Sequence, residues 1–349
     1  MAKINKAAPF LRCGETARMR RGDMLVALLP AVIIAVMQTG LRALFLSAVS
    51  AFAAWLVESV WLFVFRRKLA GIAPITMGLL IALICPVSVP WWLPAAASGA
   101  GVLLVRLPFE GMARPPFQPM AFMWLLLCLL FPAWMNVFPA IGSDNILPVF
   151  GSPGTFEEGA SISYMLGIQS RPHYGLSELL VGNLPGPMGV TSLFVIAACA
   201  VYLIYRRAIA WQAAAGMTGV CVLLGLLVDR SHAGVGWSVL YELSAAGFLF
   251  AAVYVAADTA SIPRLPAARL LYGVLCGCLA MIFRYLGMDS GGLPAAILLS
   301  QVVSLPFDRV VLYMRQGEKR DFYRLHRLYF RRLRQRQGAG MEQESGRED

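Results

Sequence analysis

Ionisable side chains stand inside apolar stretches of this chain, where a charge is costly and marks a functional site by default. Glu58 lies deep in such a stretch. We expect it to face other helices, with an arginine as partner, and to take part in cation passage. For Glu242, Asp258 and Arg284 two interpretations stay open: a helix-end charge that reaches water, which we favour, or a functional group. Asp308 joins Glu58 and Asp258 as a candidate for a cation path.

A polar segment at 139–189 is the long interruption in this otherwise apolar chain. A connection of this length inside a compact membrane domain is seldom only a linker. We therefore expect a binding site there. Its two short motifs are Glu158-Gly159-Ala160-Ser161 and Gly182-Asn183-Leu184-Pro185-Gly186.

Signatures of soluble enzymes are absent from the sequence: it has no Walker loop, no GxGxxG, no HExxH and no GxSxG. It has three histidines, and its seven cysteines lack metal-site spacing. We predict no metal site and no catalytic residue, and interpret the cysteines as small buried hydrophobes. The alternative for them is a cluster formed across helices. Those inside apolar stretches are Cys85, Cys128, Cys199, Cys221, Cys276 and Cys278.

The composition, 58% hydrophobic and 14% charged, predicts an all-α integral membrane protein. About ten transmembrane helices fit the apolar stretches, and eight with re-entrant hairpins is the alternative. The long polar segment leaves five spans on each side, which makes two inverted halves if those halves are homologous. The predicted spans are 24–38, 42–65, 72–88, 90–106, 120–138, 190–205, 211–228, 236–257, 267–286 and 292–314.

Lysines and arginines gather in alternate loops, which predicts that both termini are cytoplasmic and that 139–189 is extracytoplasmic. A bacterial or archaeal inner membrane fits this pattern. Much of the net charge of +11 lies in the Arg-rich tail, which we interpret as an anchor on anionic lipid, not a nucleic-acid site. A docking role for a cytoplasmic partner is the alternative. The expected divisions are 1–23, 24–138, 139–189, 190–314 and 315–349.

Several segments resemble, in order, the motifs of one family of membrane proteins. Residues 257–261, Ala-Asp-Thr-Ala-Ser, resemble the family's T-D-P-V-T segment. Residues 182–192 resemble G-N-I-P-G-S-I-G-E-T-S, with Val190 in place of the glutamate. Arg269-Leu-Leu-Tyr272-Gly273 matches R-x-x-Y-G, and Pro306 and Asp308, with one residue between them, resemble the closing P-x-x-D. Together these segments resemble the D subunit of the Rnf ion-translocating oxidoreductase complex and the related B subunit of the sodium-translocating NADH:quinone oxidoreductase.

The resemblance implies FMN joined through its phosphate to a threonine in the outer loop, a place held here by Ser161. A serine hydroxyl can form the same phosphodiester, and non-covalent flavin or none are the alternatives. The phosphate would need donors such as loop amides, Arg171 or His173. A second flavin, riboflavin, is expected in the bundle. The cofactor-binding residues implied are Ser161, Gly159, Ala160, Gly182, Asn183 and Gly186.

The resemblance further implies a subunit that is not catalytic alone. It would pass electrons in a ferredoxin/NAD pathway coupled to cation pumping. Its partners would be an extracytoplasmic flavoprotein, iron–sulfur subunits and a flavin transferase. The rival hypotheses are a flavin-free channel or carrier for small solutes and a non-redox scaffold subunit. A bound flavin distinguishes the first hypothesis from both rivals.

Overall fold

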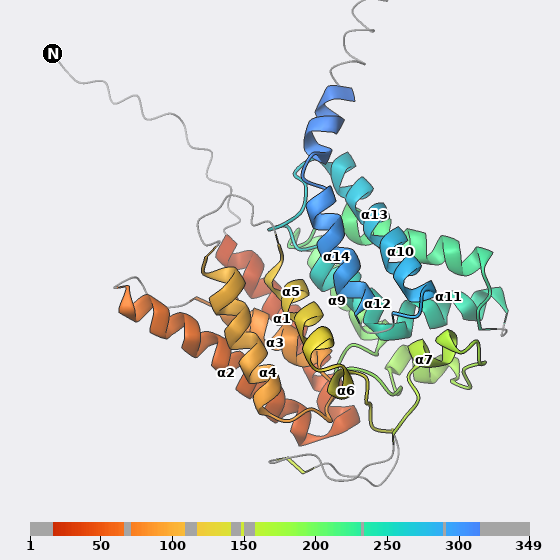
Figure 1. Ribbon diagram of the computed structural model, residues 1–349, viewed down its shortest axis with the longest axis horizontal. Helices are drawn as coiled ribbons and strands as arrows, with labels where there is room; N and C mark the ends of the chain where they lie inside the picture. The colour runs from red at the N-terminus through yellow and green to blue at the C-terminus, as the bar shows by residue number, and fades with distance from the viewer. Residues whose placement is uncertain are drawn as a thin grey trace, which may run out of the picture.

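The computed structural model describes residues 17–65, 71–108, 117–140, 148–149, 158–231, 234–288 and 291–314, and helices are its main secondary structure (Figure 1). Over these ranges there is no strand, and a single antiparallel bridge joins Pro139 to Glu158. The predicted all-α membrane fold is confirmed. The segment 1–16, the tail 315–349, the loop parts 141–147 and 150–157, His232 and Asp289 lie outside the described residues.

The helices before the long polar segment form one group. They are α1 (Ala17–Thr39), α2 (Leu41–Val64), α3 (Ala73–Ile84), α4 (Trp92–Gly101) continued by η1 (Val102–Arg106), α5 (Pro119–Leu130) and α6 (Pro132–Met135). Short helices α7 (Ile162–Gly167) and α8 (Leu176–Val181) follow within the polar segment.

The second group begins at α9. It contains α9 (Leu193–Tyr205), α10 (Trp211–Leu227), α11 (Val235–Ser244), η2 (Ala245–Gly247), α12 (Phe248–Phe250), η3 (Ala251–Ala256), α13 (Pro266–Tyr285) and α14 (Gly292–Val303). A last helix, Phe307–Met314, is bent by 51° from α14.

Each predicted span contains a helix, but their lengths differ. Four helices among the described residues are long and apolar enough to cross a membrane, or five if the bent pair at the end is one span. The other apolar helices have 10–17 residues. A span of ordinary bilayer thickness needs about 20 residues in a straight helix. The multi-pass fold is therefore established, while the number ten stays a prediction.

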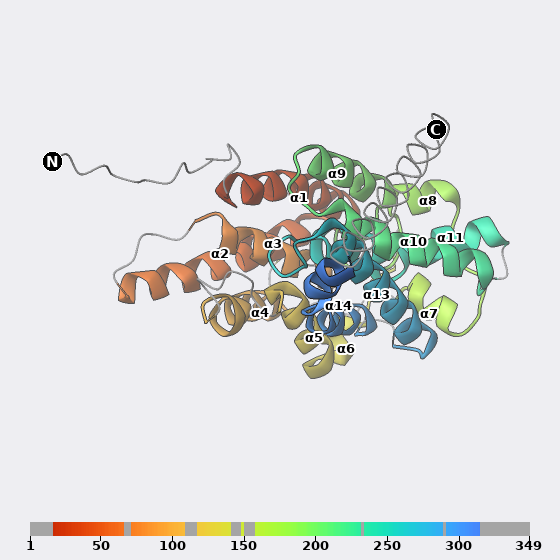
Figure 2. The same ribbon diagram turned by 90° about the horizontal axis from the view of Figure 1, so that it is seen from above.

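The two groups lie side by side and meet through two helix pairs (Figures 1 and 2). Within the groups, α2 packs on α3 and α4, and α10 packs on α13; between them, α1 contacts α9 and α5 contacts α14. Glycines permit the closest pairs: a Cβ on Gly273 would collide with the Ala213 carbonyl oxygen, so α13 and α10 meet backbone to backbone.

Irregular backbone enters the bundle at two places. The helix from Val235 to Ala256 breaks where Ala246 and Gly247 adopt positive φ angles of 49° and 67°. The non-helical segment 182–192 reaches the end of α3, where the Met188 amide donates to the Cys85 carbonyl at 3.2 Å. Irregular backbone is tolerated at membrane depth only when protein surrounds it. Both places are covered by the facing helices, and both border the same cavity.

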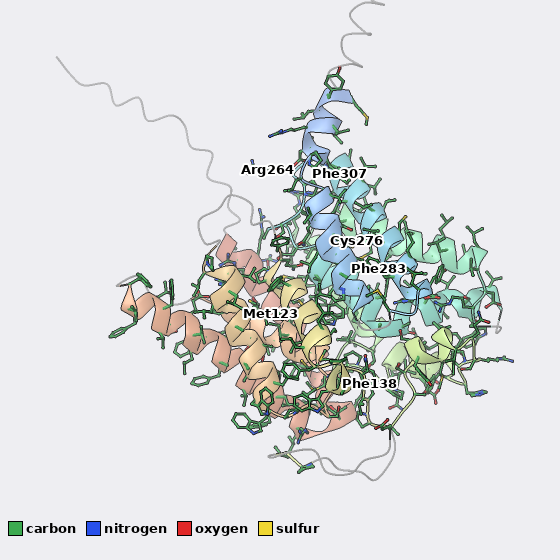
Figure 3. All side chains as sticks on the ribbon, in the orientation of Figure 1. Met123, Phe138, Arg264, Cys276, Phe283 and Phe307 are labelled. Carbon is green, nitrogen blue, oxygen red and sulfur yellow. The ribbon has the colours of Figure 1, made fainter. Side chains whose placement is uncertain are left out.

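The bundle has two distinct ends. Figure 3 shows Arg264, in the connection before α13, at one end and Phe138, at the start of the polar segment, at the other. The predicted topology requires this separation, because it assigns the arginine loops and the 139–189 segment to opposite sides of the membrane.

Candidate functional site

A cavity of about 740 Å³ opens between the two helix groups beside the polar segment. Its size falls within the usual range for small-molecule sites, and most of its lining is apolar or aromatic. The first group and its following segment contribute Ile84, Trp124, Leu125, Cys128, Leu129, Met135, Asn136 and Phe138. The remaining lining residues are 158–164, 184–187, Thr191, 244–246, Gly287, Met288 and Gly291.

The two motifs of the polar segment meet at the cavity. The Gly159 amide donates to the Phe138 carbonyl at 2.8 Å, which fixes the first motif beside α6. A Cβ on Gly159 would lie 2.6 Å from Pro185 Cγ, so only glycine allows this approach. Gly159, Ala160, Ser161 and Gly186 all line the cavity, as a shared binding site requires.

Ser161 is the N-cap of α7 and stands half-buried on the cavity wall. Its Oγ accepts from the Tyr164 amide at 3.2 Å, which satisfies one of the free amides at the helix start. Because Oγ acts there as an acceptor, its own O–H remains available for another partner. Ser161 therefore combines a fixed backbone with an accessible hydroxyl.

The hydroxyl of Tyr174 supports the same motif from outside the cavity, by donating to the Ala160 carbonyl at 3.4 Å. Burial raises the pKa of Tyr174, and the negative charge of Glu178 raises it further. The phenol therefore stays protonated and keeps donating at neutral pH.

Gly182 and Asn183, which the resemblance implies as cofactor-binding residues, lie away from the cavity. Gly182, with φ of 89°, is the left-handed C-cap of α8, and both backbone amides bond to the Glu178 carbonyl. Neither residue lines the cavity. They shape the turn that leads the chain toward Pro185, so the prediction that they contact a ligand finds no support in the geometry.

The expected phosphate donors also lie elsewhere. Arg171 and His173 do not line the cavity, and among the described lining residues Glu158 is the one with a charged side chain. The other polar groups on the lining are the loop backbone and the side chains of Asn136, Ser161, Ser163, Tyr164, Thr191 and Ser244. Of the donors considered from the sequence, the loop amides alone are in position.

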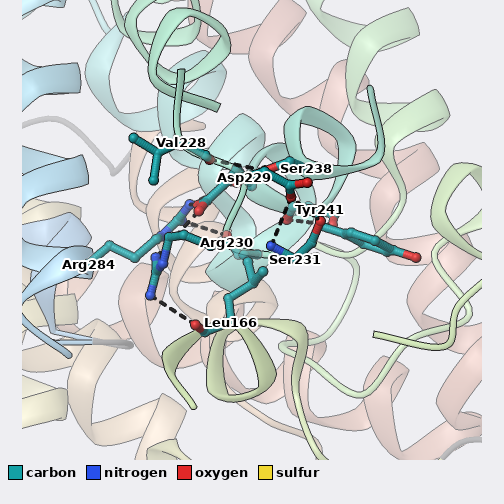
Figure 4. Close-up of polar contacts among 11 residues, drawn as sticks. Leu166, Val228, Asp229, Arg230, Ser231, Ser238, Tyr241 and Arg284 are labelled. Carbon is teal, nitrogen blue, oxygen red and sulfur yellow. Dashed lines mark hydrogen bonds and ion pairs between the residues drawn. The ribbon is translucent and has the colours of Figure 1, made fainter. Parts of the chain in front are cut away.

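Behind the cavity wall lies a buried ion-pair network (Figure 4). Arg284 donates to Glu242 Oε2 at 2.7 Å and to the carbonyls of Glu242 and Ala245 at 2.8 and 2.9 Å. Arg230 pairs with Glu242 Oε1 at 3.4 Å and donates to the Leu166 carbonyl at 3.1 Å. The interpretation of Glu242 and Arg284 as charges that reach water is wrong, because Glu242 is fully buried and Arg284 is 3% exposed.

Glu58 faces the bundle and pairs with an arginine, as predicted. Arg106 Nε lies 2.7 Å from Glu58 Oε2, and Glu58 is 4% exposed. Arg106 comes from η1 in the neighbouring helix, a partner that the sequence pattern does not identify.

The other two carboxylates of the predicted cation path have separate surroundings. Asp258 accepts from Gln118 Nε2 at 3.3 Å and from the Ala260 amide at 3.3 Å. Asp308 accepts from the backbone amides of Arg264 and Leu265 at 3.0–3.1 Å, at the start of α13. The geometry thus gives Asp308 a capping role and does not link the three carboxylates by direct contacts.

The cysteines behave as small hydrophobes. Among the described ones, all but Cys278 are buried, and none forms a disulfide with another described cysteine. No group of three or more potential metal ligands occurs in the described part of the chain.

Arg42 is an important residue that the sequence motifs did not reveal. It is 1% exposed, and its guanidinium donates to the carbonyls of Val87, Val89 and Pro148 at 2.8, 3.0 and 2.5 Å. An arginine at the start of an apolar stretch was the available signal, because a charge there must find partners. Arg42 fixes the turn between α3 and α4.

A family model described as the NQR2, RnfD, RnfE family matches residues 4–316. The chain belongs to this family. Similar proteins include the D subunit of the ion-translocating oxidoreductase complex of Stutzerimonas stutzeri, 25% identical over 70% of this chain and 75% of its own. Members of the NQR2, RnfD, RnfE family thus match this chain over most of its length, as the resemblance in the motifs predicted.

Two further relatives are named for the ion that their complexes move. The D subunit of the Na(+)-translocating ferredoxin:NAD(+) oxidoreductase complex of Acetobacterium woodii is 22% identical over 87% of this chain and 92% of its own. The D subunit of the proton-translocating ferredoxin:NAD(+) oxidoreductase complex of Clostridium ljungdahlii is 22% identical over 90% and 96%. Relatives named for different ions match equally well.

Proposed function

We propose that this chain is the membrane subunit of an Rnf-type complex, which binds FMN in the cavity and passes electrons between partner redox subunits. The pathway would join ferredoxin and NAD and drive cation pumping across the inner membrane, with both termini cytoplasmic. The observation that carries the proposal is the position of Ser161: its accessible hydroxyl stands on the wall of a largely apolar cavity. Family membership supplies the functional context.

The described residues fit a flavin nucleotide. Trp124, Phe138 and Met135 offer aromatic and apolar surface for a large flat ring. Half-buried Ser161 would carry the phosphate where water and the loop amides reach it. Attachment would form a bond from Ser161 Oγ to the FMN phosphorus of a flavin dinucleotide. The phosphoanhydride bond to the departing nucleotide would break, the hydroxyl would lose its proton, and a flavin transferase would catalyse the step.

Bound flavin would supply the electron-transfer chemistry, and this chain would position it and exclude water. Contact between Gly159 and Pro185 holds the attachment motif, residues 158–161, against the non-helical segment 182–192. Electrons would arrive from and leave to an extracytoplasmic flavoprotein and iron–sulfur subunits. Glu58, Asp258 and Asp308 remain candidates for the cation path.

A second, non-covalent flavin, riboflavin, would find its polar contacts inside the bundle. Gln118 and Gln301 are 3% and 1% exposed, and Gln118 Oε1 and Gln301 Nε2 have no hydrogen-bond partner among the described residues. An unpaired acceptor and an unpaired donor on two glutamines in contact would suit a neutral ring edge that carries both kinds of group. Gln301→Leu should reduce the flavin released on denaturation and leave the covalent flavin unchanged.

In-gel fluorescence and intact mass of the denatured protein, purified from cells that express the transferase, test the proposal. Wild type should fluoresce and carry an added FMN phosphate mass. Ser161→Ala should lose both signals. Ser163→Ala, a change to another hydroxyl on the cavity lining, should keep them. If no covalent flavin is present and the native protein releases none, the flavin role is refuted, and a channel, carrier or scaffold takes its place.

A further inference from the structure

None of the described residues that line the cavity has a positively charged side chain, although the proposed occupant carries a phosphate. Glu158, the charged residue on the described part of the lining, has the wrong sign to attract an anion. Positive charge lies behind the wall, where Arg284 donates to the carbonyl of the lining residue Ala245 at 2.9 Å.

Two arginine side chains of that network pair with one carboxylate. Arg284 and Arg230 share the single carboxylate of Glu242, at 2.7 and 3.4 Å. The adjacent Asp229 directs its carboxylate to Ser231 and the Gly234 amide. Arg284 and Glu242 are almost fully buried, so water screens them little and their charge acts over several ångströms.

Arg284 also holds the wall in shape. The break after α11 leaves backbone carbonyls without helical hydrogen-bond partners. The Arg284 guanidinium donates hydrogen bonds to two of these carbonyls, those of Glu242 and Ala245. Ser244, Ala245 and Ala246, the residues of the break, line the cavity. The ring of Phe248, just past the break, stacks on the guanidinium, with its centroid 5.2 Å from Arg284 Cζ. The same group therefore determines both the position of this wall and the charge behind it.

We propose that Arg284 is a positioning residue that makes the cavity selective for an anionic occupant. The carboxylate of Glu242 partly neutralises the charge of Arg284. The charge preference follows from this chain's own residues. The identification of the occupant as flavin rests on the proposed function.

A cysteine reporter tests the charge preference without any flavin. Ser161→Cys places a thiol on the lining and removes the attachment hydroxyl. Its reaction with an anionic sulfonate methanethiosulfonate and with a cationic trimethylammonium methanethiosulfonate is followed by peptide mass in the purified chain. The measured quantity is the ratio of the anionic to the cationic rate, in the reporter alone and combined with Arg284→Gln, Arg284→Lys or Glu242→Gln.

Opposite changes are expected from the two neutralising substitutions. Arg284→Gln should lower the ratio roughly three- to tenfold, and Glu242→Gln should raise it by a similar factor, because each shifts the local charge by one unit. Arg284→Lys keeps the charge and should stay near the reporter value. Arg106→Gln, in a buried pair that does not line the cavity, serves as matched control and should leave the ratio unchanged.

A purely structural role gives a different pattern. Loosening of the wall would change both reagent rates in the same direction and leave their ratio constant, with Arg284→Lys as disruptive as Arg284→Gln. That result would overturn the proposal, and Arg284→Lys decides it if the glutamine variants fail to fold. In the flavin-loaded protein, Arg284→Gln should lower the flavin midpoint potential. If no flavin is found, only this last measurement is lost, and the reagent ratio still decides the inference.

Discussion

Gly159 and Pro185, from two motifs of the polar segment, are in contact so close that a Cβ on Gly159 would lie 2.6 Å from Pro185 Cγ. The Ala140 backbone stands on another side of the same position, at 3.1 Å. Neither neighbour is a flexible side chain. The contact therefore fixes the attachment motif relative to the non-helical segment 182–192.

Substitution of Gly159 should disturb this contact. Gly159→Ala is expected to lower the free energy of unfolding by about 1–3 kcal/mol through overpacking, and to reduce flavin retention. Gly175→Ala is the matched control, because its Cβ meets nothing within 4 Å and its φ of −78° suits any residue. Denaturant titration in detergent measures both variants. Equal stability of the two would show that the motifs are not held by this contact.

Arg42 should be essential for the turn between α3 and α4. Arg42→Gln leaves buried carbonyls at Val87 and Val89 unpaired, and we expect a loss of about 3 kcal/mol or more. Arg206→Gln, which breaks the exposed pair with Asp23, should cost about 0–1 kcal/mol. Thermal unfolding followed by tryptophan fluorescence compares the two. A small effect at Arg42 would contradict the anchoring role.

The Glu58–Arg106 pair allows stability and ion transport to be separated. Glu58→Gln should cost about 3 kcal/mol, because it strands a largely buried arginine. The double variant with Arg106→Gln should recover most of that loss. Cation uptake by vesicles containing the complex should remain impaired in the double variant if Glu58 is part of the path. Full recovery of uptake would make the pair structural only.

Asp308 offers a similar distinction through its capping contacts. Asp308→Ala removes an acceptor for the Arg264 and Leu265 amides and should cost about 1–2 kcal/mol. Asp308→Asn keeps an acceptor and should cost less. Wild-type ion transport in Asp308→Asn would remove this residue from the cation path, whereas lost transport at retained stability would keep it there.

The sequence predicts local features of this molecule better than it predicts contacts between distant segments. Apolar length located the helices, and the cost of a buried charge predicted an arginine beside Glu58. The left-handed cap at Gly182 was available from a glycine after an apolar run, although we interpreted it as a ligand contact. The Arg284 contacts were not predictable, because they depend on where α11 breaks and on which helix faces that break.

Flavin content of the native protein tests the proposed function most directly. The chain, purified in mild detergent from cells with the transferase, would be assayed for bound and released flavin per polypeptide. We predict one or two flavins per chain. The covalently bound flavin should be lost in Ser161→Ala and kept in Ser163→Ala. A colourless wild-type protein that releases no flavin would contradict the proposed function.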